Sequence, residues 1–350
     1  MKKKVAILIV NYNGLTWLPK CLVAALETTE TEIEKRVYVV DNKSTDGSLD
    51  YVSGLSTIQL ITLTANLGFA GGNNAGYHYL LNEGWADYIF LLNQDAYLTD
   101  NCLSTLVAAC QSQPQLIAVQ PLLRLYPQTE LVNSTGNHIQ YLGFGFSGNN
   151  GQRLTTEQIQ GQTINYCSGA AVLIDLSKIF RVGGLYDDFM FMYLEDLDFG
   201  WRSTLAGFRQ ALVPTATIYH QYEFKRSIRQ VYYFERNRLW ILFKNYRLGT
   251  LLVLLPMILI MELGQLLFAL ANGWLGAKLK GYVWLLKPTS IRLFWKDRQR
   301  TQALRKVSDR EILQQFSATI QFQPLDSLGL RVANIVMACY YRLILMIIYW

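Results

Sequence analysis

The sequence predicts an α/β fold in which helices flank a mostly parallel sheet, followed by a C-terminal helical region associated with a membrane. Two apolar runs, residues 37–40 and 88–92, each end close to a carboxylate, Asp41 and Asp95. Buried strands of a parallel sheet are continuous apolar runs, and ligands of open α/β sheets bind at the carboxyl ends of the strands. We therefore expect Asp41 and Asp95 to face one ligand.

Strand and helix patterns alternate in the first hundred residues. Residues 5–10 are an apolar run that leads into a polar turn with one exposed aromatic ring, Tyr12. Residues 15–26 have helical apolar spacing, which with the next strand begins a βαβ unit. Cap and turn formers fill residues 42–48, and a third short strand follows over 60–63.

A glycine-rich segment, residues 66–76, comes after the third strand. Its glycines allow the backbone to approach a ligand closely at the start of a helix. Further along, residues 126–165 are rich in Gly, Asn, Gln and Thr, which indicates loops around short strands. A strand-like run over 216–219 leads into His220.

Charge divides the chain into two regions. Between Lys225 and Arg310 there are seventeen Lys and Arg against four Asp and Glu, a net charge of +13, which leaves −7 for the rest of a chain of net charge +6. A local basic surface indicates an anionic partner, either membrane phospholipid or a diphosphate-linked lipid, and not nucleic acid. The length of 350 residues also exceeds one usual domain.

An apolar run over residues 248–277 contains one charge, Glu262. It is longer than the roughly 20 residues that span a bilayer. Basic residues on both sides favour a broken helical hairpin, or helices in the membrane plane on the cytoplasmic face, over one clean span. The apolar segment 328–350 is expected beside it. The alternative is that both are core helices of an α-helical subdomain or a dimer interface, so a homo-oligomer stays open.

The five cysteines exclude two other classes of protein. They form an odd set without a Cys-x-x-Cys pair, which argues against a disulfide framework and against a thiolate zinc site. A reducing cytoplasm is the simplest setting. Lys2 to Lys4 and the apolar residues after them resemble a signal peptide, but the run is too short and predicts a strand instead.

Four ordered motifs resemble the signature series of family 2 glycosyltransferases, most closely the bacterial rhamnosyltransferase-like members that assemble cell-surface polysaccharides. The motifs are residues 11–13, 40–48, 66–76 and 195–198, and the resemblance covers residues 5 to about 245. It implies a GT-A-type glycosyltransferase domain over residues 1–225, with the membrane-associated helical region over 226–350.

The resemblance implies a nucleotide-sugar site at the first motifs. Tyr12 would stack on a pyrimidine, and Asp41 would accept a hydrogen bond from the N3–H of the base. Gly71, Gly72 and Asn74 would line the donor cleft with backbone amides near ribose or phosphate. The alternatives are an ordinary loop aromatic for Tyr12, a helix cap for Asp41, and helix–sheet packing for some of the glycines.

A divalent cation, Mg²⁺ or Mn²⁺, is expected to neutralise the departing diphosphate, because hard oxygen ligands suit both ions. Asp95 is the first candidate ligand. Most family members have Asp-x-Asp at this point, whereas this chain has Asn93-Gln94-Asp95. Asn93 is therefore expected to contact the donor and Asp95 to hold the metal. His220 falls where related enzymes supply a histidine ligand, although an isolated histidine is more often structural.

The segment 189–202 places acids among aromatic residues. Low polarity raises the pKa of a carboxyl group toward useful base strength. By resemblance, Asp196 is the base that deprotonates the acceptor hydroxyl, and Glu195 assists or orients the acceptor. Asp198 is expected to pair with Arg202 at i+4 for structural reasons. The alternative is a helix N-terminus that is merely rich in acids.

The predicted reaction is inverting transfer of a sugar, first of all rhamnose from dTDP-rhamnose, to a lipid-linked or growing saccharide at the cytoplasmic face of the cell membrane. A processive polysaccharide synthase is the enzymatic alternative, but its Gln-x-x-Arg-Trp motif is missing around Arg229. The other alternative is a catalytically degenerate scaffold or partner subunit, which Asn93 keeps open.

Overall fold

The computed structural model describes residues 2–222, 228–321 and 328–350, and the chain divides into two compact units. Unit 1 consists of Met1–Asn137, Ser147–Gly200 and Phe208–Glu223, and unit 2 consists of His138–Phe146, Trp201–Gly207 and Phe224–Trp350. The predicted domain boundary at residues 225–226 lies outside the described residues.

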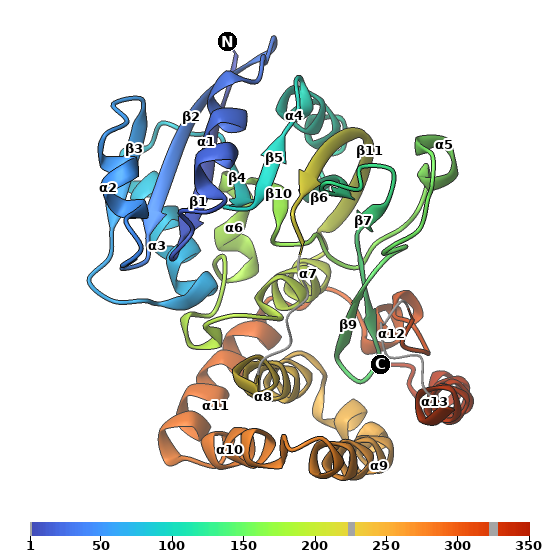
Figure 1. The fold of residues 1–350 in the computed structure, drawn as a ribbon. Helices are drawn as coiled ribbons and strands as arrows, with labels where there is room; N and C mark the ends of the chain where they lie inside the picture. The colour runs from blue at the N-terminus through green and yellow to red at the C-terminus, as the bar shows by residue number, and fades with distance from the viewer. Residues whose placement is uncertain (1, 223–227, 322–327) are drawn as a thin grey trace. The chain divides into compact units, whose positions relative to one another are not determined.

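Unit 1 is built on a mixed sheet in the order β3-β2-β1-β4-β10-β6-β11-β5, with β7 paired to β6. In Figure 1, β3 lies at one side of this sheet and β6 and β11 lie toward the other. The strands are β1 (Lys3–Asn11), β2 (Ile33–Asp41), β3 (Ile58–Thr62), β4 (Tyr88–Asn93), β5 (Ala96–Leu98), β6 (Leu116–Leu125), β7 (Val132–Ser134), β10 (Ala171–Asp175) and β11 (Arg209–His220).

Strands β3, β2, β1 and β4 are parallel, as the apolar runs predict. Asn11 is in register with Asp41, and Val10 is in register with Asn93, so the carboxyl ends of these strands form one edge. Asp41 and the Asn93–Asp95 segment therefore lie at one edge of the sheet, and the expectation that Asp41 and Asp95 face one ligand stays a prediction.

The second half of the sheet is not mostly parallel. Strand β10 pairs antiparallel with both β4 and β6, and β5 pairs antiparallel with the end of β11. These later strands are short or interrupted by polar residues, so their direction could not be read from apolar runs. The antiparallel pairs matter for function because the β5–β11 pair aligns Ala96 with His220.

Helices cover this sheet, and its interior is an apolar core that includes Ile7, Val39 and Phe90, each fully buried. The glycine-rich segment begins a helix at Gly68, as predicted. The helices and the small hairpin of the first 205 residues are α1 (Leu18–Glu27), α2 (Ser48–Ser53), α3 (Gly68–Glu83), α4 (Cys102–Ser112), β8 (Asn137–Gln140), β9 (Phe144–Ser147), α5 (Thr156–Ile159), α6 (Leu176–Ile179) and α7 (Glu195–Leu205), with 3₁₀ turns at Phe180–Val182 and Asp188–Met190.

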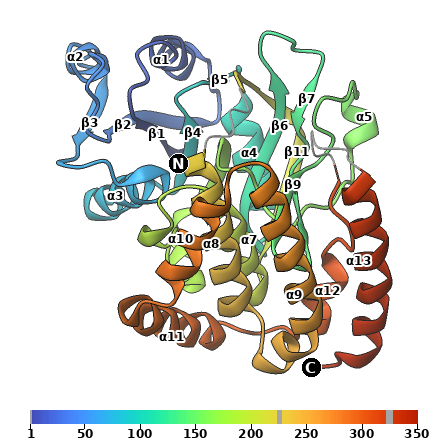
Figure 2. The same cartoon turned by 60° about the horizontal axis from the view of Figure 1, so that its bottom comes forward.

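Unit 2 is mainly helical. Helix α8 packs against α10 and α11. Helix α9 packs against α13, and Figure 2 shows these two helices side by side. The predicted break in the long apolar run lies at Gly273, whose φ of +76° ends one helix before the next begins. The helices are α8 (Ile228–Asn245), α9 (Leu248–Ala271), α10 (Leu275–Leu285), α11 (Pro288–Ala303), α12 (Asp309–Gln315) and α13 (Leu328–Ile347).

Glu262, the one charge in the apolar run, belongs to a buried ionic network of unit 2. Lys278 donates to Glu235 at 2.6 Å and lies 3.1 Å from Glu262, and Arg238 pairs with both carboxylates. Although burial raises the pKa of the Glu262 carboxyl, the cations Arg238 and Lys278 lower it to about 2. The two positive charges compensate the two negative charges, so Glu262 has a structural role inside unit 2.

The outer face of α9 is apolar and exposed. Among the described residues, the segments Leu248–Ala271 and Gly329–Ile347 are the two helices long and apolar enough to cross a membrane by length and composition. Most of each helix is not covered by protein. The exposed leucines of α9 recur at helical spacing and are Leu248, Leu252, Leu255, Leu259, Leu263, Leu267 and Leu270.

Close packing of α3 on β1 gives a first prediction. A Cβ at Gly76 would lie 2.5 Å from both terminal methyls of Leu8, which is fully buried. Gly76→Ala should therefore lower the free energy of unfolding by about 1–3 kcal/mol, the usual cost of overpacking. In the matched variant Gly264→Ala, on α9, the added methyl meets open space. It should raise helix stability by about 0.5–1 kcal/mol. Thermal unfolding of the full chain measures both, and equal shifts would contradict the packing role.

Candidate active site

The carboxyl end of β1 organises the expected nucleotide site. Asn11 is buried, and its Nδ2 donates to Asp41 Oδ1 at 2.9 Å. The backbone N–H of Ser44 donates to Asp41 Oδ2 at 3.0 Å, so both carboxylate oxygens already accept one bond. Each oxygen retains a further lone pair. Asp41 is thus held rigidly, and its contact with a base stays a prediction.

Gln94 links the loop that contains Tyr12 to the loop after β4 by a hydrogen bond. Its Oε1 accepts from the backbone N–H of Tyr12 at 3.1 Å, and the Tyr12 ring is exposed. Gly14 makes room for this contact, because a Cβ there would lie 2.3 Å from the Gln94 oxygen. The middle residue of Asn93-Gln94-Asp95 therefore fixes the backbone that presents the aromatic ring.

The three residues of α3 that are predicted to line the donor cleft, Gly71, Gly72 and Asn74, make packing contacts in the structure. Cβ atoms at Gly71 and Gly72 would lie 2.6 Å from Leu67 Cβ and 2.7 Å from Val10 Cγ1. Asn74 Nδ2 donates to the carbonyl of Tyr186 at 2.8 Å, and Asn74 Oδ1 accepts from the Tyr186 N–H at 3.1 Å. Gly72 therefore lies where α3 packs on β1, Gly71 meets Leu67 at the start of its own helix, and Asn74 anchors a loop. Their contact with a donor stays a prediction.

Asp95 and His220, two candidates far apart in sequence, lie together. His220 Nε2 is 3.3 Å from Asp95 Oδ1, and the Gln221 N–H donates to the Asp95 carbonyl at 2.9 Å. On the other side of the ring, Nδ1 contacts Asn133 Oδ1 at 2.8 Å. Because an amide oxygen only accepts, this contact is a hydrogen bond when Nδ1 carries the proton. The Nε2 atom faces the carboxylate.

This arrangement fits a divalent cation. A second partner that orients a ligating histidine is typical of metal sites, and Asn133 supplies it. Within the described ranges no cluster of three or more His, Cys, Asp and Glu side chains is suited to a metal. Asp95 and His220 would hold the ion only with further oxygens, which a bound diphosphate carries.

Asp196 is fixed by two backbone amides near the start of α7. The Gly169 N–H donates to Oδ2 at 3.1 Å, and the Leu197 N–H donates to Oδ1 at 2.8 Å. Burial raises the pKa of the Asp196 carboxyl to about 6, while the two amides act to lower it. Asp196 keeps part of its surface exposed. It can therefore both reach a ligand and take up a proton near neutral pH.

Glu195 differs from its neighbour in exposure and partners. It is only 6% exposed, and no described residue forms a hydrogen bond with its Oε2. Burial, and then the charge of Asp196, raise the pKa of the Glu195 carboxyl well above its usual value. Glu195 therefore favours the protonated state and supports its neighbour. The expected ion pair between Asp198 and Arg202 stays a prediction; both side chains are buried.

The loop before Asp196 is strained. Phe191, Tyr193 and Leu194 have φ values of 63°, 68° and 66°, which side-chain-bearing residues rarely adopt. Each such residue costs about 1–3 kcal/mol and persists where surrounding contacts hold it. One holding contact is the Ala70 N–H, which donates to the Phe191 carbonyl at 3.0 Å. A Cβ at Gly68 would lie 2.2 Å from that carbonyl oxygen, so the glycine-rich segment makes room for this loop.

A short segment, residues 167–170, connects the end of β4 to Asp196 by hydrogen bonds. The Asn93 N–H donates to the Ala170 carbonyl at 2.9 Å, and the next residue back, Gly169, bonds to Asp196. The same segment is held by two glutamines. Gln120 Oε1 accepts a hydrogen bond from the Ser168 N–H at 2.6 Å, and Gln210 Oε1 accepts one from the Cys167 N–H at 2.7 Å. The expected donor and base residues therefore belong to one connected region of unit 1.

Sequence reasoning missed the residues that hold these side chains in place. Gln94, Asn133 and Gln120 lie outside or between the motif positions, and an amide side chain in a loop gives no signal of its partner. Lys20 was also missed. Its Nζ lies 4.5 Å from the centre of the Tyr97 ring and 3.5 Å from the centre of the Tyr126 ring. In the sequence, Tyr97 follows Asp95 by two residues and Tyr126 follows Gln120 by six. Only tertiary contacts bring these groups together.

Comparison with known proteins agrees with the fold and the motifs. Residues 6–179 match the model of the glycosyl transferase family 2. The N-acetylglucosaminyl-diphospho-decaprenol L-rhamnosyltransferase of Mycobacterium tuberculosis is 27% identical over 232 residues, which cover 61% of this chain and 75% of that protein. The rhamnosyltransferase WbbL of Escherichia coli K12 is 27% identical over 233 residues, 62% of this chain and 83% of its own.

A solved structure supports the fold. The mannosyltransferase PcManGT from Pyrobaculum calidifontis, in complex with GDP-Man and Mn²⁺, superposes with a TM-score of 0.51 at 16% identity and covers 87% of this chain and 86% of its own. At this identity the likeness concerns the GT-A-like α/β architecture alone. With the family match, the ordered motifs and the two rhamnosyltransferase relatives, the chain belongs to glycosyl transferase family 2, in its rhamnosyltransferase-like branch.

Proposed function

We propose that this protein transfers a sugar from a nucleotide donor, with inversion, to a lipid-linked saccharide at a membrane surface. The observation that carries the proposal is Asp196, a partly exposed carboxylate held by two backbone amides, whose pKa burial raises to about 6. A base of this strength accepts a proton at neutral pH. The residue lies in the same unit as the Asp95 and His220 pair.

In the proposed reaction Asp196 accepts the proton of the acceptor hydroxyl. The hydroxyl oxygen then attacks the anomeric carbon, and the bond from that carbon to the diphosphate breaks on the opposite side. Because the Gly169 and Leu197 amides fix both carboxylate oxygens, the base does not have to be ordered when the acceptor binds. Glu195 stays protonated behind it and leaves a single negative charge at this point.

The donor would bind along the aligned ends of β2, β1 and β4. Tyr12 would stack on the base, with Gln94 holding its backbone, and Asp41 would accept from the base edge. Asp95 and His220 would hold Mg²⁺ or Mn²⁺, which neutralises the departing diphosphate. The Mn²⁺ in the solved complex of a protein with this fold supports the choice of metal.

Rhamnose from dTDP-rhamnose is the proposed donor sugar, because two relatives are named as rhamnosyltransferases. One of them is named for a decaprenol-linked diphosphate sugar, which supports a lipid-diphosphate saccharide as the acceptor. The exposed leucines of α9 and the surrounding positive charge suit a peripheral position on an anionic membrane surface, at the cytoplasmic face.

The test is mass spectrometry of the products formed by the full chain from a panel of sugar nucleotides, with a lipid-diphosphate sugar as the acceptor. Transfer of rhamnose from dTDP-rhamnose is the expected result. Transfer of another sugar would correct the donor alone. Absence of transfer and of donor hydrolysis with every sugar nucleotide would favour the scaffold alternative.

Substitution of the base gives the second prediction. Asp196→Asn keeps the size of the side chain but cannot accept the proton, so transfer should fall by about 10²-fold or more. Affinity for the donor should persist, because Asp196 does not bind it. Glu195→Gln should lower transfer much less. If Glu195→Gln were inactive and Asp196→Asn nearly normal, the base would be Glu195.

The pH profile of the wild type is part of the same test. Burial raises the pKa of Asp196 to about 6, and only the deprotonated carboxylate can act as the base. Transfer should therefore increase as the pH rises through about 6 and decrease below it. Asp196→Asn should lose this limb of the profile, and a limb that survives in this variant would belong to another group.

Metal dependence gives the third prediction. Asp95→Asn should abolish transfer. In Mn²⁺ the variant should bind the nucleoside diphosphate more weakly than the wild type does, because it lacks a metal ligand. In EDTA, where no metal is bound, the two proteins should bind it about equally. Calorimetric titration with both solutions measures the difference. Asp50→Asn, an exposed acid on α2, is the matched control. Full activity of the wild type in EDTA would mean that cationic side chains stabilise the diphosphate, and His220 would lose its proposed role.

A further inference from the structure

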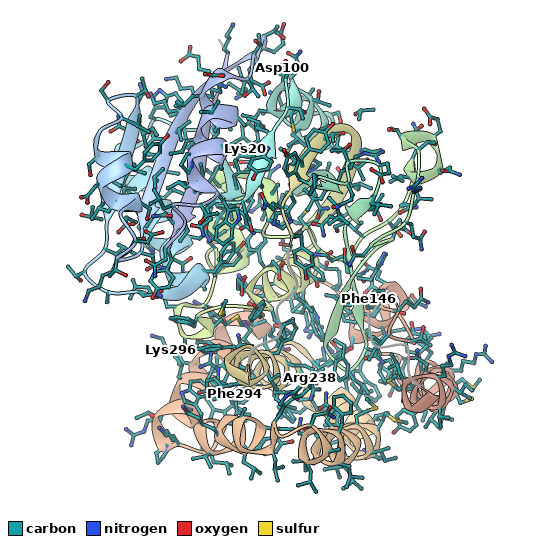
Figure 3. All side chains as sticks on the ribbon, in the orientation of Figure 1. Lys20, Asp100, Phe146, Arg238, Phe294 and Lys296 are labelled. Carbon is teal, nitrogen blue, oxygen red and sulfur yellow. The ribbon has the colours of Figure 1, made fainter. Side chains whose placement is uncertain are left out.

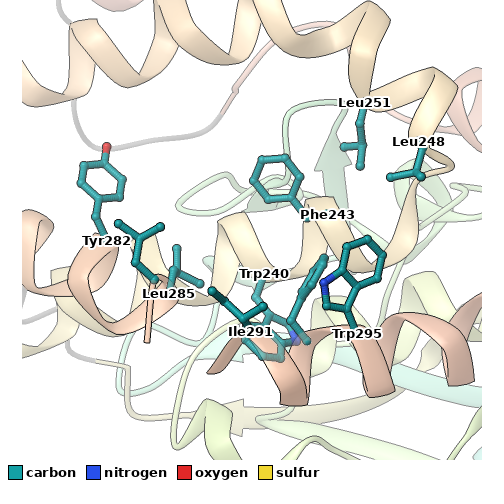
Figure 4. A pocket seen from close by; sticks show the side chains of 10 residues that line it. Trp240, Phe243, Leu248, Leu251, Tyr282, Leu285, Ile291 and Trp295 are labelled. Carbon is teal, nitrogen blue, oxygen red and sulfur yellow. The ribbon is translucent and has the colours of Figure 1, made fainter. Parts of the chain in front are cut away.

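A half-open pocket in unit 2 does not suit the sugar of the proposed donor. It is lined by aliphatic and aromatic side chains, among them Trp240 and Trp295, which Figure 4 shows. Phe294, another lining residue, is labelled in Figure 3. A sugar carries hydroxyl groups on most of its carbon atoms, and this wall cannot satisfy their hydrogen bonds. The transferred sugar therefore needs a surface elsewhere.

In unit 1 the segment 167–170 extends from the proposed metal site to the proposed base. Ala170 accepts from the Asn93 N–H, and Gly169 donates to Asp196. In the proposed reaction the anomeric carbon is bonded to the metal-bound diphosphate and is attacked by the hydroxyl that Asp196 deprotonates. The transferred sugar therefore has to lie beside this segment.

Phe69, the second residue of α3, lies against the same segment. A Cβ at Gly169 would be 3.1 Å from Phe69 Cε1 and 3.8 Å from Asp196 Cβ, so the ring and the base lie on either side of one missing methyl group. Phe69 and Asp196 both keep part of their surface exposed, whereas Gly169 between them is buried. The aromatic ring and the base therefore border the same region of the protein surface.

The Phe69 ring is held in place by two buried aromatic residues. Its centroid is 6.2 Å from that of Tyr186, and the Tyr186 ring meets Phe199 of α7 edge to face at 6.3 Å. Asn74 in turn holds both the N–H and the carbonyl of Tyr186. Because α7 also carries Asp196, this row of rings fixes the position of Phe69 relative to the base before any ligand binds.

A partly exposed aromatic ring suits the apolar side of a sugar. One side of many hexose rings is formed by C–H bonds, which pack against the negative face of an aromatic ring while the hydroxyls bond elsewhere. A 6-deoxyhexose has a methyl group where other hexoses have a hydroxymethyl group. Against the ring it gains apolar burial and leaves no hydroxyl unpaired. The ring therefore favours a deoxyhexose.

We propose that the transferred sugar of the donor packs on Phe69, with the methyl group of a 6-deoxyhexose against the ring. The inference rests on the proposed function and adds the residue that selects the sugar. Asp95 and Asp196 act on the diphosphate and on the acceptor hydroxyl, which are common to many donors and acceptors. Phe69 contacts the part of the donor that differs between nucleotide sugars, so it determines specificity.

Calorimetric titration of the full chain in Mn²⁺ tests the contact without requiring catalysis. Phe69→Leu keeps an apolar side chain but removes the ring, so the Kd for dTDP-rhamnose should rise by about two- to tenfold, the usual size of an aromatic contact. The Kd for dTDP, which lacks the transferred sugar, should not change. Phe180→Leu, at an exposed phenylalanine of unit 1, is the matched control. An unchanged Kd for dTDP-rhamnose, or an equal increase for dTDP, would overturn the proposal.

Saturation-transfer NMR locates the contact on the sugar. In the wild type the methyl protons of rhamnose should receive saturation from the protein. In Phe69→Leu their signal should fall relative to that of the thymine methyl group, which binds elsewhere. A constant ratio of the two signals would place the rhamnose methyl group away from Phe69 and contradict the proposed contact.

Kinetics with a lipid-diphosphate sugar acceptor separate this inference from the proposed function. Phe69→Leu should raise the KM for dTDP-rhamnose and leave the KM for the acceptor unchanged. An increase in the acceptor KM alone would assign the ring to the acceptor and refute the inference. Binding of dTDP-rhamnose that depends on Phe69, in a protein that transfers no sugar, would refute the proposed reaction and leave the contact standing. Rhamnose transfer that is the same in wild type and variant would do the reverse.

Discussion

The candidate site depends on one constraint, the placement of β1 between β2 and β4 in parallel register. This register brings Asn11 beside Asp41 and Val10 beside Asn93. The amide of Asn11 then joins Asp41 to Ser44 and Ser48, so the loops after two strands share one hydrogen-bonded centre. A shift of one residue would turn each side chain to the opposite face of the sheet. Tyr12, Asp41 and Gln94 would then no longer belong to one surface.

The N-terminal strands and the helix at Gly68 could be predicted because their signals are local. Continuous apolar runs mark parallel strands, and a glycine-rich turn marks the following helix start. The meeting of Asp95 with His220 could not be derived in this way. It depends on an antiparallel pair between the three-residue strand β5 and the end of β11, and only the family resemblance suggested it. The same holds for Asn133 and Gln94, whose amide groups act through contacts distant in sequence.

Unit 2 buries one group of charges and leaves much of its apolar surface exposed. Arg238 and Lys278 are buried and pair with the partly buried Glu235 and Glu262, while leucines of α9 are exposed. Buried ion pairs are tolerated when every charge has partners, and here Gln265 adds hydrogen bonds to both cations. Hydropathy along the sequence treats Glu262 as an interruption of an apolar run. In the structure it joins helices whose outer faces are left apolar, and this separation explains why the run contains a charge at all.

Asn93 has a definite electrostatic consequence for the proposed cation. With an amide in place of the first carboxylate of the family pattern, this segment offers the cation one negative charge, that of Asp95, rather than two. One carboxylate and one imidazole leave most positions of a Mg²⁺ or Mn²⁺ ion to other oxygens, and the diphosphate of the donor carries them. The amide is therefore compatible with a cation that is bound weakly by the protein alone and firmly with the nucleotide. In such a site the donor completes the metal coordination, and the structural demand on the protein is limited to holding Asp95 and His220 in place, which Gln221 and Asn133 do.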